Sequence, residues 1–346
     1  MGLEELLELQ GKRGLVLGIG GGGDVASAAL LHLWLGLFKA EAKVGGVVWE
    51  RFPVDPTPGP IALSEIKPAK RVGACLAWVT GEAEAKRGDR RFKPQVARVA
   101  EALGEEALAI DLWAGPKRVA EDLHRLAEDA FEFIVGVDVG GDVLATGEED
   151  GLWSPLADQA MLAALAQLEE RGIRVILAVH GLGVDGELSE PYLLRRLSLL
   201  ASKGGYLGAL GMGRRGAERL KKVLSRVETE SSALPLLAFE GGYGYKALRS
   251  STRGVKLSLI SSITFLVDPL RLFEEAPMAK ALASADSLEE ANERLHELGV
   301  YTELDLERDL YEVYRAKGRV TRRDVLKVKR EGLSRLRGGY TATSST

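Results

Sequence analysis

The stretch Leu15-Val16-Leu17-Gly18-Ile19-Gly20-Gly21-Gly22-Gly23-Asp24 decides the fold of this chain. Three apolar residues typical of a strand run into a glycine-rich turn, and a helical pattern over 24–38 follows at once. The glycines fit the G-x-G-x-x-G spacing, which between a strand and a helix predicts a loop whose backbone N–H groups approach a phosphate. A tight strand-to-helix turn without a ligand is the alternative.

The alternation of short apolar runs with longer helical runs continues along the chain. Strands are predicted at 44–49, 71–79, 107–112, 133–137, 173–179, 234–239 and 255–267, and helices at 94–103, 116–130, 155–170, 190–202 and 213–225. Ser154 is expected to cap the helix that Pro155 opens. Continuous apolar runs are typical of strands buried on both faces of a parallel sheet. The sequence therefore predicts an α/β protein with a Rossmann-like, doubly wound, mostly parallel sheet.

The pattern changes from about Pro269, where helical runs follow one another without strands. We expect a Rossmann-like domain over 1–270, a helical C-terminal appendage over 271–337 and a flexible tail over 338–346. Thr321, with Asp324 three residues on, predicts the start of a last, basic helix. Its basic residues are expected to form a solvated face, and a polyanion site is the alternative.

Composition narrows the function classes. The 346 residues contain no uninterrupted apolar run of the ~20 residues that a membrane span requires, and the N-terminus lacks the layout of a signal peptide, so we expect a cytoplasmic protein. A net charge of −4 argues against a nucleic-acid partner. The single cysteine, Cys75, is expected to be a buried thiol. A single asparagine and 28% charged residues indicate a thermophile, for which we also expect a homo-oligomer.

Acidic residues and glycines recur where the predicted strands end. Ligands of open α/β sheets bind outside the carboxyl ends of the strands, so the sequence predicts one acidic crevice there. The residues expected at this edge are Asp111, Asp138, Asp142, Asp185, Glu187, Glu240 and Asp268.

Two kinds of chemistry fit such a crevice. Asp138, Asp142 and Asp185 supply the oxygen ligands that Mg²⁺ or Ca²⁺ prefers. Alternatively, Asp142, Asp185 and Glu187 act as catalytic carboxylates that bind sugar hydroxyls or serve as a general base. His180, at the end of a predicted strand, is a candidate general acid or base because its reference pKa is near neutrality. A hydrogen-bonded structural histidine is the other interpretation.

The glycine loop supplies the nucleotide-binding candidates, which are Gly18, Gly20, Gly21, Gly22 and Gly23. Asp24 is expected either to cap the following helix or to hold a metal or a ligand hydroxyl. Glu50 ends the second predicted strand, where an acidic side chain binds ribose in Rossmann proteins; a surface carboxylate is the alternative. The polar segment 249–254, with two arginines and three hydroxyls, could clamp a phosphate or form an ordinary solvated loop.

Several motifs together resemble a known family. They are GIGGGGDV at 18–25, Glu50-Arg51 with DPxPGP at 55–60, FxPQxAR at 92–98, DxGGD at 138–142, SPLxD at 154–158 and GxDGE at 183–187. The chain is similar over about 13–270 to an archaeal group known only as a domain of unknown function. The resemblance implies a shared site on these loops and names no activity.

The favoured hypothesis is an enzyme of hydrolytic or group-transfer type that binds a nucleotide or another phosphorylated small molecule, with Asp138, Asp142, Asp185 and Glu187 expected either to hold a divalent cation or to polarise the substrate. A non-catalytic nucleotide- or metabolite-binding protein and a nicotinamide-dependent oxidoreductase are the alternatives.

Overall fold

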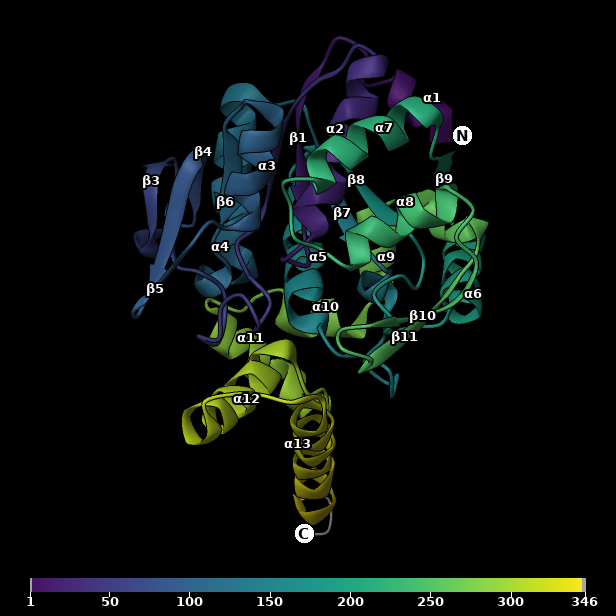
Figure 1. Cartoon of the computed structure of the whole chain (residues 1–346). Helices are drawn as coiled ribbons and strands as arrows, with labels where there is room; N and C mark the ends of the chain where they lie inside the picture. Colours follow the sequence, from purple (N-terminus) through teal and green to yellow (C-terminus); the bar gives the residue numbers. More distant parts are fainter. Residues whose placement is uncertain (1, 344–346) are drawn as a thin grey trace.

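The computed structural model describes the backbone of residues 2–343, in which ten strands form one mixed sheet (Figure 1). Its order is β3-β4-β6-β2-β1-β7-β8-β12-β9, with β5 paired to β4. Five adjacent strands are parallel: β6 (Ala107–Ile110), β2 (Glu41–Val47), β1 (Arg13–Gly18), β7 (Phe133–Val139) and β8 (Arg174–His180). When these five strands are numbered by their order in the sequence, they lie in the sheet in the order 3-2-1-4-5. This is the order of doubly wound dinucleotide-binding folds, and its direction reverses between β1 and β7. The predicted Rossmann-like α/β architecture is therefore confirmed.

The remaining strands are antiparallel. They are β3 (Ile66–Arg71), β4 (Leu76–Arg87), β5 (Arg90–Phe92), β9 (Tyr206–Gly211) and β12 (Ile263–Val267), together with the separate hairpin of β10 (Gly244–Leu248) and β11 (Arg253–Leu257). Because β12 runs against β8, Asp268 follows it at the opposite edge of the sheet from the carboxyl ends of the parallel strands. The expectation that Asp268 joins the acidic crevice is therefore wrong. Its carboxylate instead accepts a hydrogen bond of 3.0 Å from the Arg271 amide at the start of a helix.

The strand predicted at 234–239 is also wrong, because Leu234–Phe239 forms the helix α8. A six-residue apolar run fits either structure, and here Pro235 occupies the first turn of the helix, a position that proline favours. Glu240 consequently follows a helix and forms an ion pair with Lys221. The long strand predicted at 255–267 is two strands, β11 and β12, separated by a short 3₁₀ helix.

Helices cover both faces of the sheet. On one face lie α2 (Asp24–Leu37), α3 (Gln95–Leu103) and α7 (Arg214–Leu224), and on the other α4 (Gly115–Ala130), α5 (Pro155–Glu170), α9 (Pro269–Glu274), α10 (Pro277–Leu282) and α11 (Leu288–Glu297). Further helices are α1 (Gly2–Leu7), α6 (Glu190–Ser202), α8, α12 (Glu303–Lys317) and α13 (Arg322–Thr343), and the 3₁₀ helices are η1 (Leu63–Glu65), η2 (Leu112–Ala114), η3 (Asp142–Leu144), η4 (Ser231–Ala233) and η5 (Leu259–Ser262).

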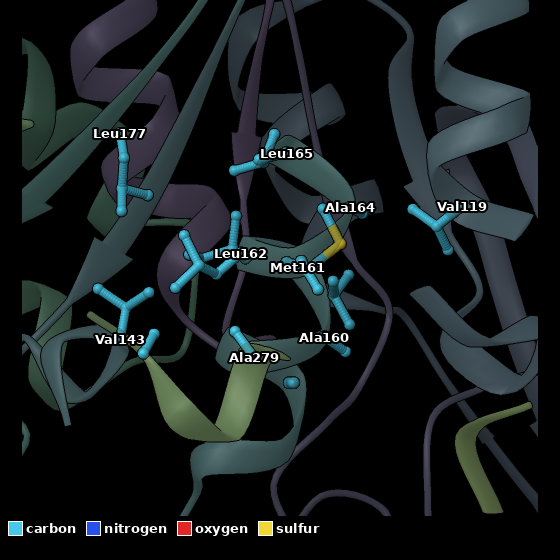
Figure 2. Packing of buried hydrophobic residues seen from close by; sticks show 14 of the residues in the cluster. Val119, Val143, Ala160, Met161, Leu162, Ala164, Leu165, Leu177 and Ala279 are labelled. Carbon is cyan, nitrogen blue, oxygen red and sulfur yellow. The ribbon is translucent and has the colours of Figure 1, made fainter. Parts of the chain in front are cut away.

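Helix α5 is buried along almost its whole length, between the sheet and α10 (Figure 2). Its small and apolar residues, among them Met161 and Leu165, fill the space between the two layers. The fit is close: a Cβ atom on Gly136 of β7 would lie 2.5 Å from Leu165 Cδ1. The start of α5 is thereby held against the carboxyl ends of β7 and β8.

The C-terminal helices continue the same packing before they leave the body. The boundary expected at residue 270 falls inside α9, and Leu272, Met278 and Leu282 belong to the same buried cluster as Leu177 of the sheet. Beyond them, α12 and α13 (yellow) project from one end of the molecule, near the β10–β11 hairpin (Figure 1).

The last basic helix begins as predicted. Thr321 N donates to Asp324 Oδ2 at 3.0 Å, and Asp324 N donates to Thr321 Oγ1 at 3.3 Å. Helix α13 includes 338–343 of the segment expected to be a flexible tail, and 344–346 lie outside the described residues. No helix within 2–343 combines the length and apolarity needed to cross a bilayer.

Candidate functional site

A cavity of about 390 Å³ lies at the carboxyl edge of the parallel strands. The loops after β1, β2, β7 and β8 line it, the β10–β11 turn adds a further side, and α12 with the start of α13 closes it from the C-terminal end. Gly20, Gly21, Gly22 and Gly23 supply backbone to the lining, and most of the other lining residues are polar or charged. Among these polar and charged residues are Asp24, Glu50, Arg51, Asp142, Ser154, Asp158, Asp185, Glu187, Arg249, Arg253, Glu303 and Glu307.

The glycine loop has the conformation that only glycine adopts readily. Gly21 and Gly22 have φ angles of +79° and +51°, and the Gly22 amide donates to Trp49 O at 2.7 Å. Gly18 has another role, because a Cβ atom there would lie 2.5 Å from the backbone nitrogen of Val25. Gly18 therefore allows β1 and α2 to pack closely and does not line the cavity.

Three aspartates meet beside this loop, and we call them the first carboxylate triad: Asp24, Asp138 and Asp158. One oxygen from each lies within 4.8 Å of the others. Asp24 opens α2, Asp138 is in β7 and Asp158 lies in the first turn of α5, so three separate elements bring them together. The Asp24 side chain is not the N-cap of α2, because Gly23 occupies that position and no side-chain hydrogen bond caps the helix. Its Oδ2 accepts a hydrogen bond of 2.9 Å from the Gly20 amide.

The first carboxylate triad has no positive partner. Asp138 is fully buried, and neither of its oxygens has a hydrogen-bond partner among the described residues; Asp158 Oδ1 is buried and unpartnered too. Within the described chain, no basic side chain forms an ion pair or hydrogen bond with any of the three. Burial raises the pKa of Asp138 to about 7, and burial together with neighbouring carboxylates raises the pKa values of Asp24 and Asp158 well above their usual range. Like charges this close cannot all ionise without a compensating cation.

A second carboxylate triad, Asp142, Asp185 and Glu187, lies in the loops after β7 and β8, and one oxygen from each also lies within 4.8 Å of the others. This triad is partly neutralised. Arg253 Nη1 lies 2.6 Å from Glu187 Oε1, and both side chains are buried.

Glu187 also accepts bonds from the Trp153 amide at 2.6 Å and from the Ser154 hydroxyl. The pKa of Glu187 is lowered, because these donors and Arg253 outweigh its burial. The Ser154 hydroxyl therefore does not cap α5, contrary to the expectation from its position before Pro155.

The geometry of the first carboxylate triad suits a hard divalent cation. Oxygens on opposite sides of a Ca²⁺ ion at ~2.4 Å would be about 4.8 Å apart, and around Mg²⁺ at ~2.1 Å they would be about 4.2 Å apart. Three oxygens that all lie within 4.8 Å of one another are close enough to share one such ion.

Glu50 lies three residues after β2 and lines the cavity. It is buried, so the alternative of a surface carboxylate is wrong, and its role as a ribose ligand stays a prediction. Its Oε1 accepts a hydrogen bond of 2.7 Å from the Gln95 amide, and burial raises its pKa to about 7. Asp111, at the end of β6, instead accepts bonds from the Trp113 and Leu63 amides and does not line the cavity.

His180 ends β8 but is not one of the residues that line the cavity. It is fully buried, and its Nδ1 lies 2.8 Å from Thr264 Oγ1 on the neighbouring strand. Burial lowers its pKa to about 4, so the imidazole is neutral at physiological pH.

Acidic residues of α5 and α12 complete the site, and the sequence reasoning did not select them. Glu303 accepts bonds from the Leu156 and Ala157 amides at 2.9 and 2.8 Å, which caps α5 from another helix. Asp158 stands in the motif that begins at Ser154, and an acidic residue in the first helical turn after a strand-end loop is a signal that could have identified it. Glu303 carries no such signal, because only the tertiary fold brings α12 to the sheet edge.

Two aromatic rings in the cavity lining lie against each other, with the Arg90 guanidinium 5.8 Å from the Tyr314 ring centroid. Phe52 and Tyr314 meet edge to face with ring centroids 6.4 Å apart, and Leu310 and Val325 lie in the same lining. A flat, partly apolar group fits beside these rings.

Comparison with known proteins gives one match. A family model described as "Protein of unknown function (DUF1152)" matches residues 15–311, from β1 into α12. No curated protein and no solved structure matches the chain. The match includes the glycine loop, both carboxylate triads and the acidic residues of α12. It also confirms the resemblance to a family of unknown function that the motifs indicated. The chain therefore belongs to the family described as protein of unknown function (DUF1152).

Proposed function

We propose that this protein binds a divalent cation together with a phosphorylated small molecule, with nucleotides as the favoured class, and catalyses hydrolysis or group transfer at the phosphate. The observation that carries the proposal is the first carboxylate triad itself, three buried carboxyl groups with no basic partner among the described residues. Such groups stay neutral, as their raised pKa values indicate, or ionise when a cation binds between them. A bound Mg²⁺, Mn²⁺ or Ca²⁺ supplies that positive charge.

The surroundings of the triad favour a phosphorylated partner for the cation. The cavity lies where the strand order reverses, which is the usual ligand position in doubly wound sheets. Arg249 and Arg253 line it, and a divalent ion commonly bridges carboxylates to phosphate oxygens. The aromatic pair Phe52 and Tyr314 offers a surface for a nucleobase.

The second carboxylate triad suits the chemical step. Glu187 is fixed by Arg253 and Ser154, whereas neither oxygen of Asp185 has a hydrogen-bond partner among the described residues. Burial and the neighbouring Glu187 raise the pKa of Asp185 to about 8, so its deprotonated form at and above that pH accepts a proton from an attacking water or alcohol, while the phosphorus–oxygen bond to the leaving group breaks. Asp142 is placed to share a second cation with it.

The oxidoreductase alternative has weaker support. A dinucleotide pyrophosphate would need the amides of the glycine loop, but the Gly20 amide already donates to Asp24 and the Gly22 amide to Trp49. Two carboxylates also lie against Gly20, and they would repel a phosphate unless a cation stood between them.

The test is a titration with Mn²⁺ in which binding is measured as the decrease of the electron paramagnetic resonance signal of unbound Mn²⁺. Wild-type protein is expected to bind Mn²⁺, and Asp138→Asn to bind it at least tenfold more weakly, with Asp129→Asn as the exposed-carboxylate control. Phosphate release from a panel of nucleotides and sugar phosphates is then measured with Mn²⁺ present. Asp185→Asn is expected to abolish turnover while keeping the ion of the first triad.

Failure of wild-type protein to bind Mn²⁺, Mg²⁺ or Ca²⁺ would contradict the proposal. Cation and nucleotide binding without turnover on any substrate would instead support the non-catalytic alternative.

A further inference from the structure

The turn that joins β10 to β11 has an unusual backbone. Arg249, Ser250 and Ser251 have φ angles of +50°, +54° and +64°, so three successive residues that are not glycine adopt the left-handed conformation. Residues with a Cβ atom rarely do this even singly. The turn is held by bonds from the Thr252 amide at 3.1 Å and the Thr252 hydroxyl at 2.8 Å to Arg249 O. Such a conformation persists when the surroundings fix it, and it is concentrated at ligand sites.

The side chain at the start of this turn is a cation without a partner. Arg249 lines the cavity, its Nε is buried without a hydrogen bond, and no described carboxylate lies within ion-pair distance of its guanidinium. Arg253, four residues on, is the contrasting case, because it is tied to Glu187 at 2.6 Å. The two arginines of the hairpin therefore differ: Arg253 holds a carboxylate in place, and Arg249 is free to bind an anion.

The charges that face Arg249 are balanced around it. Arg51 and Arg253 repel its charge, and Asp185 and Glu187 attract it. Burial and the two arginines lower its pKa to about 9, which leaves the guanidinium charged at neutral pH. An arriving anion would thus meet a charged, partly desolvated fork of donors, in which a charge-assisted hydrogen bond is strong.

We infer that Arg249 binds a phosphoryl oxygen of the ligand, with the Ser250 hydroxyl beside it in the cavity lining. This inference rests on the proposed function and adds which residue recognises the phosphate. The cation of the first carboxylate triad and the guanidinium of Arg249 hold the phosphate from two sides. The left-handed turn is what directs the side chain of Arg249 into the cavity.

The experiment measures pyrophosphate binding by isothermal titration calorimetry in the presence of saturating Mn²⁺. Arg249→Ala is expected to weaken pyrophosphate binding at least tenfold, and Arg249→Lys to weaken it less, because lysine keeps the charge and loses the planar fork. Lys246→Ala is the matched control, because Lys246 is an exposed cation of the same hairpin that does not line the cavity. Mn²⁺ affinity in the absence of pyrophosphate is expected to be unchanged or higher in Arg249→Ala.

Two further variants test the turn with every ligand-binding side chain retained. Ser251→Gly keeps the left-handed conformation without the strain of a Cβ atom, so its melting temperature is expected to rise and its pyrophosphate affinity to stay near that of wild type. Ser251→Val, whose β-branched side chain disfavours that conformation, is expected to lower pyrophosphate affinity severalfold. An unchanged affinity in Ser251→Val would overturn the role assigned to the turn.

The outcomes separate this inference from the proposed function. Pyrophosphate affinity equal to wild type in Arg249→Ala, with normal Mn²⁺ binding, would overturn the inference and leave the cation site standing. Pyrophosphate binding that depends on Arg249 but not on any divalent cation would support the inference and contradict the proposed cation dependence.

Discussion

Gly20 has no space for a side chain, because a Cβ atom there would lie 2.7 Å from Asp158 Oδ2 and 2.8 Å from Asp24 Oδ2. The same residue donates its amide to Asp24. A glycine that the sequence marks as a phosphate ligand thus also sets the position of two carboxylates of the first triad. The loop and the triad form one structural unit.

Replacing Gly20 by alanine tests that coupling. The added methyl group must push Asp24 and Asp158 apart, so we expect Mn²⁺ affinity to fall at least tenfold, a loss of about 1.4 kcal/mol in binding free energy. The control is Gly36→Ala in α2, where a Cβ atom meets nothing within 4 Å. Alanine in a helix interior is expected to raise the free energy of unfolding by roughly 0.5–1 kcal/mol and to leave Mn²⁺ affinity unchanged. Equal Mn²⁺ affinities in Gly20→Ala and wild type would show that the loop and the triad are independent.

At the scale of elements, the sequence predicted most of the central sheet and part of the site. Buried parallel strands are continuous apolar runs, so β1, β6, β7 and β8 were visible, and the carboxyl-end residues Asp138, Asp142 and Asp185 followed from them. Strand direction was not visible, which is why Asp268 was placed at the wrong edge.

The acids of α12 were missed for a different reason. Their contribution depends on which helix packs against which loop, and neither periodicity nor turn chemistry encodes that packing.

Helix α12 is fastened to the site through buried carboxylates, and Glu307 shows the consequence for stability. Its Oε2 accepts bonds from Trp49 Nε1 at 2.9 Å and from the Gly59 amide at 2.8 Å, yet burial raises its pKa from 4.5 to about 8. The folded state therefore keeps a proton that the unfolded chain loses between pH 4.5 and 8. The contribution of Glu307 to stability is fully present below pH 4.5 and is lost as pH rises to about 8.

Glu307→Gln removes this titration and keeps an oxygen to accept both bonds. We expect the free energy of unfolding of the variant, relative to wild type, to increase from pH 5 to pH 8, by at most about 1.4 kcal/mol per pH unit. Urea unfolding across that range measures it. Glu312→Gln, on the exposed side of the same helix, should follow the wild-type pH profile. If the free energy of unfolding of Glu307→Gln changed with pH in parallel with that of wild type, Glu307 would not hold a buried proton in the folded state.

At the scale of the whole molecule, the cavity belongs to no single segment of the chain. The glycine loop near residue 20, the β8–α6 loop near 185, the hairpin near 250 and α12 near 305 are far apart in sequence and meet only at the carboxyl edge of the sheet. Each contributes polar or charged groups to the one cavity lining. Binding should therefore stabilise all four segments at once, in proportion to the ratio of ligand concentration to dissociation constant.

Hydrogen exchange with Mn²⁺ and pyrophosphate measures this coupling. We expect slower amide exchange in 18–26, 182–188, 244–257 and 303–325, because local opening of any of these segments would release the ligand. The edge strands β3 and β9, which contribute no residue to the cavity lining, serve as the internal control and should exchange unchanged. Protection confined to 18–26 would mean that the cation and phosphate bind at the glycine loop alone, with α12 and the hairpin as bystanders. We expect wild-type protein to show protection in all four segments and Arg249→Ala to lose it only in the hairpin. This pair of results would show that the phosphate links the hairpin to the edge of the sheet.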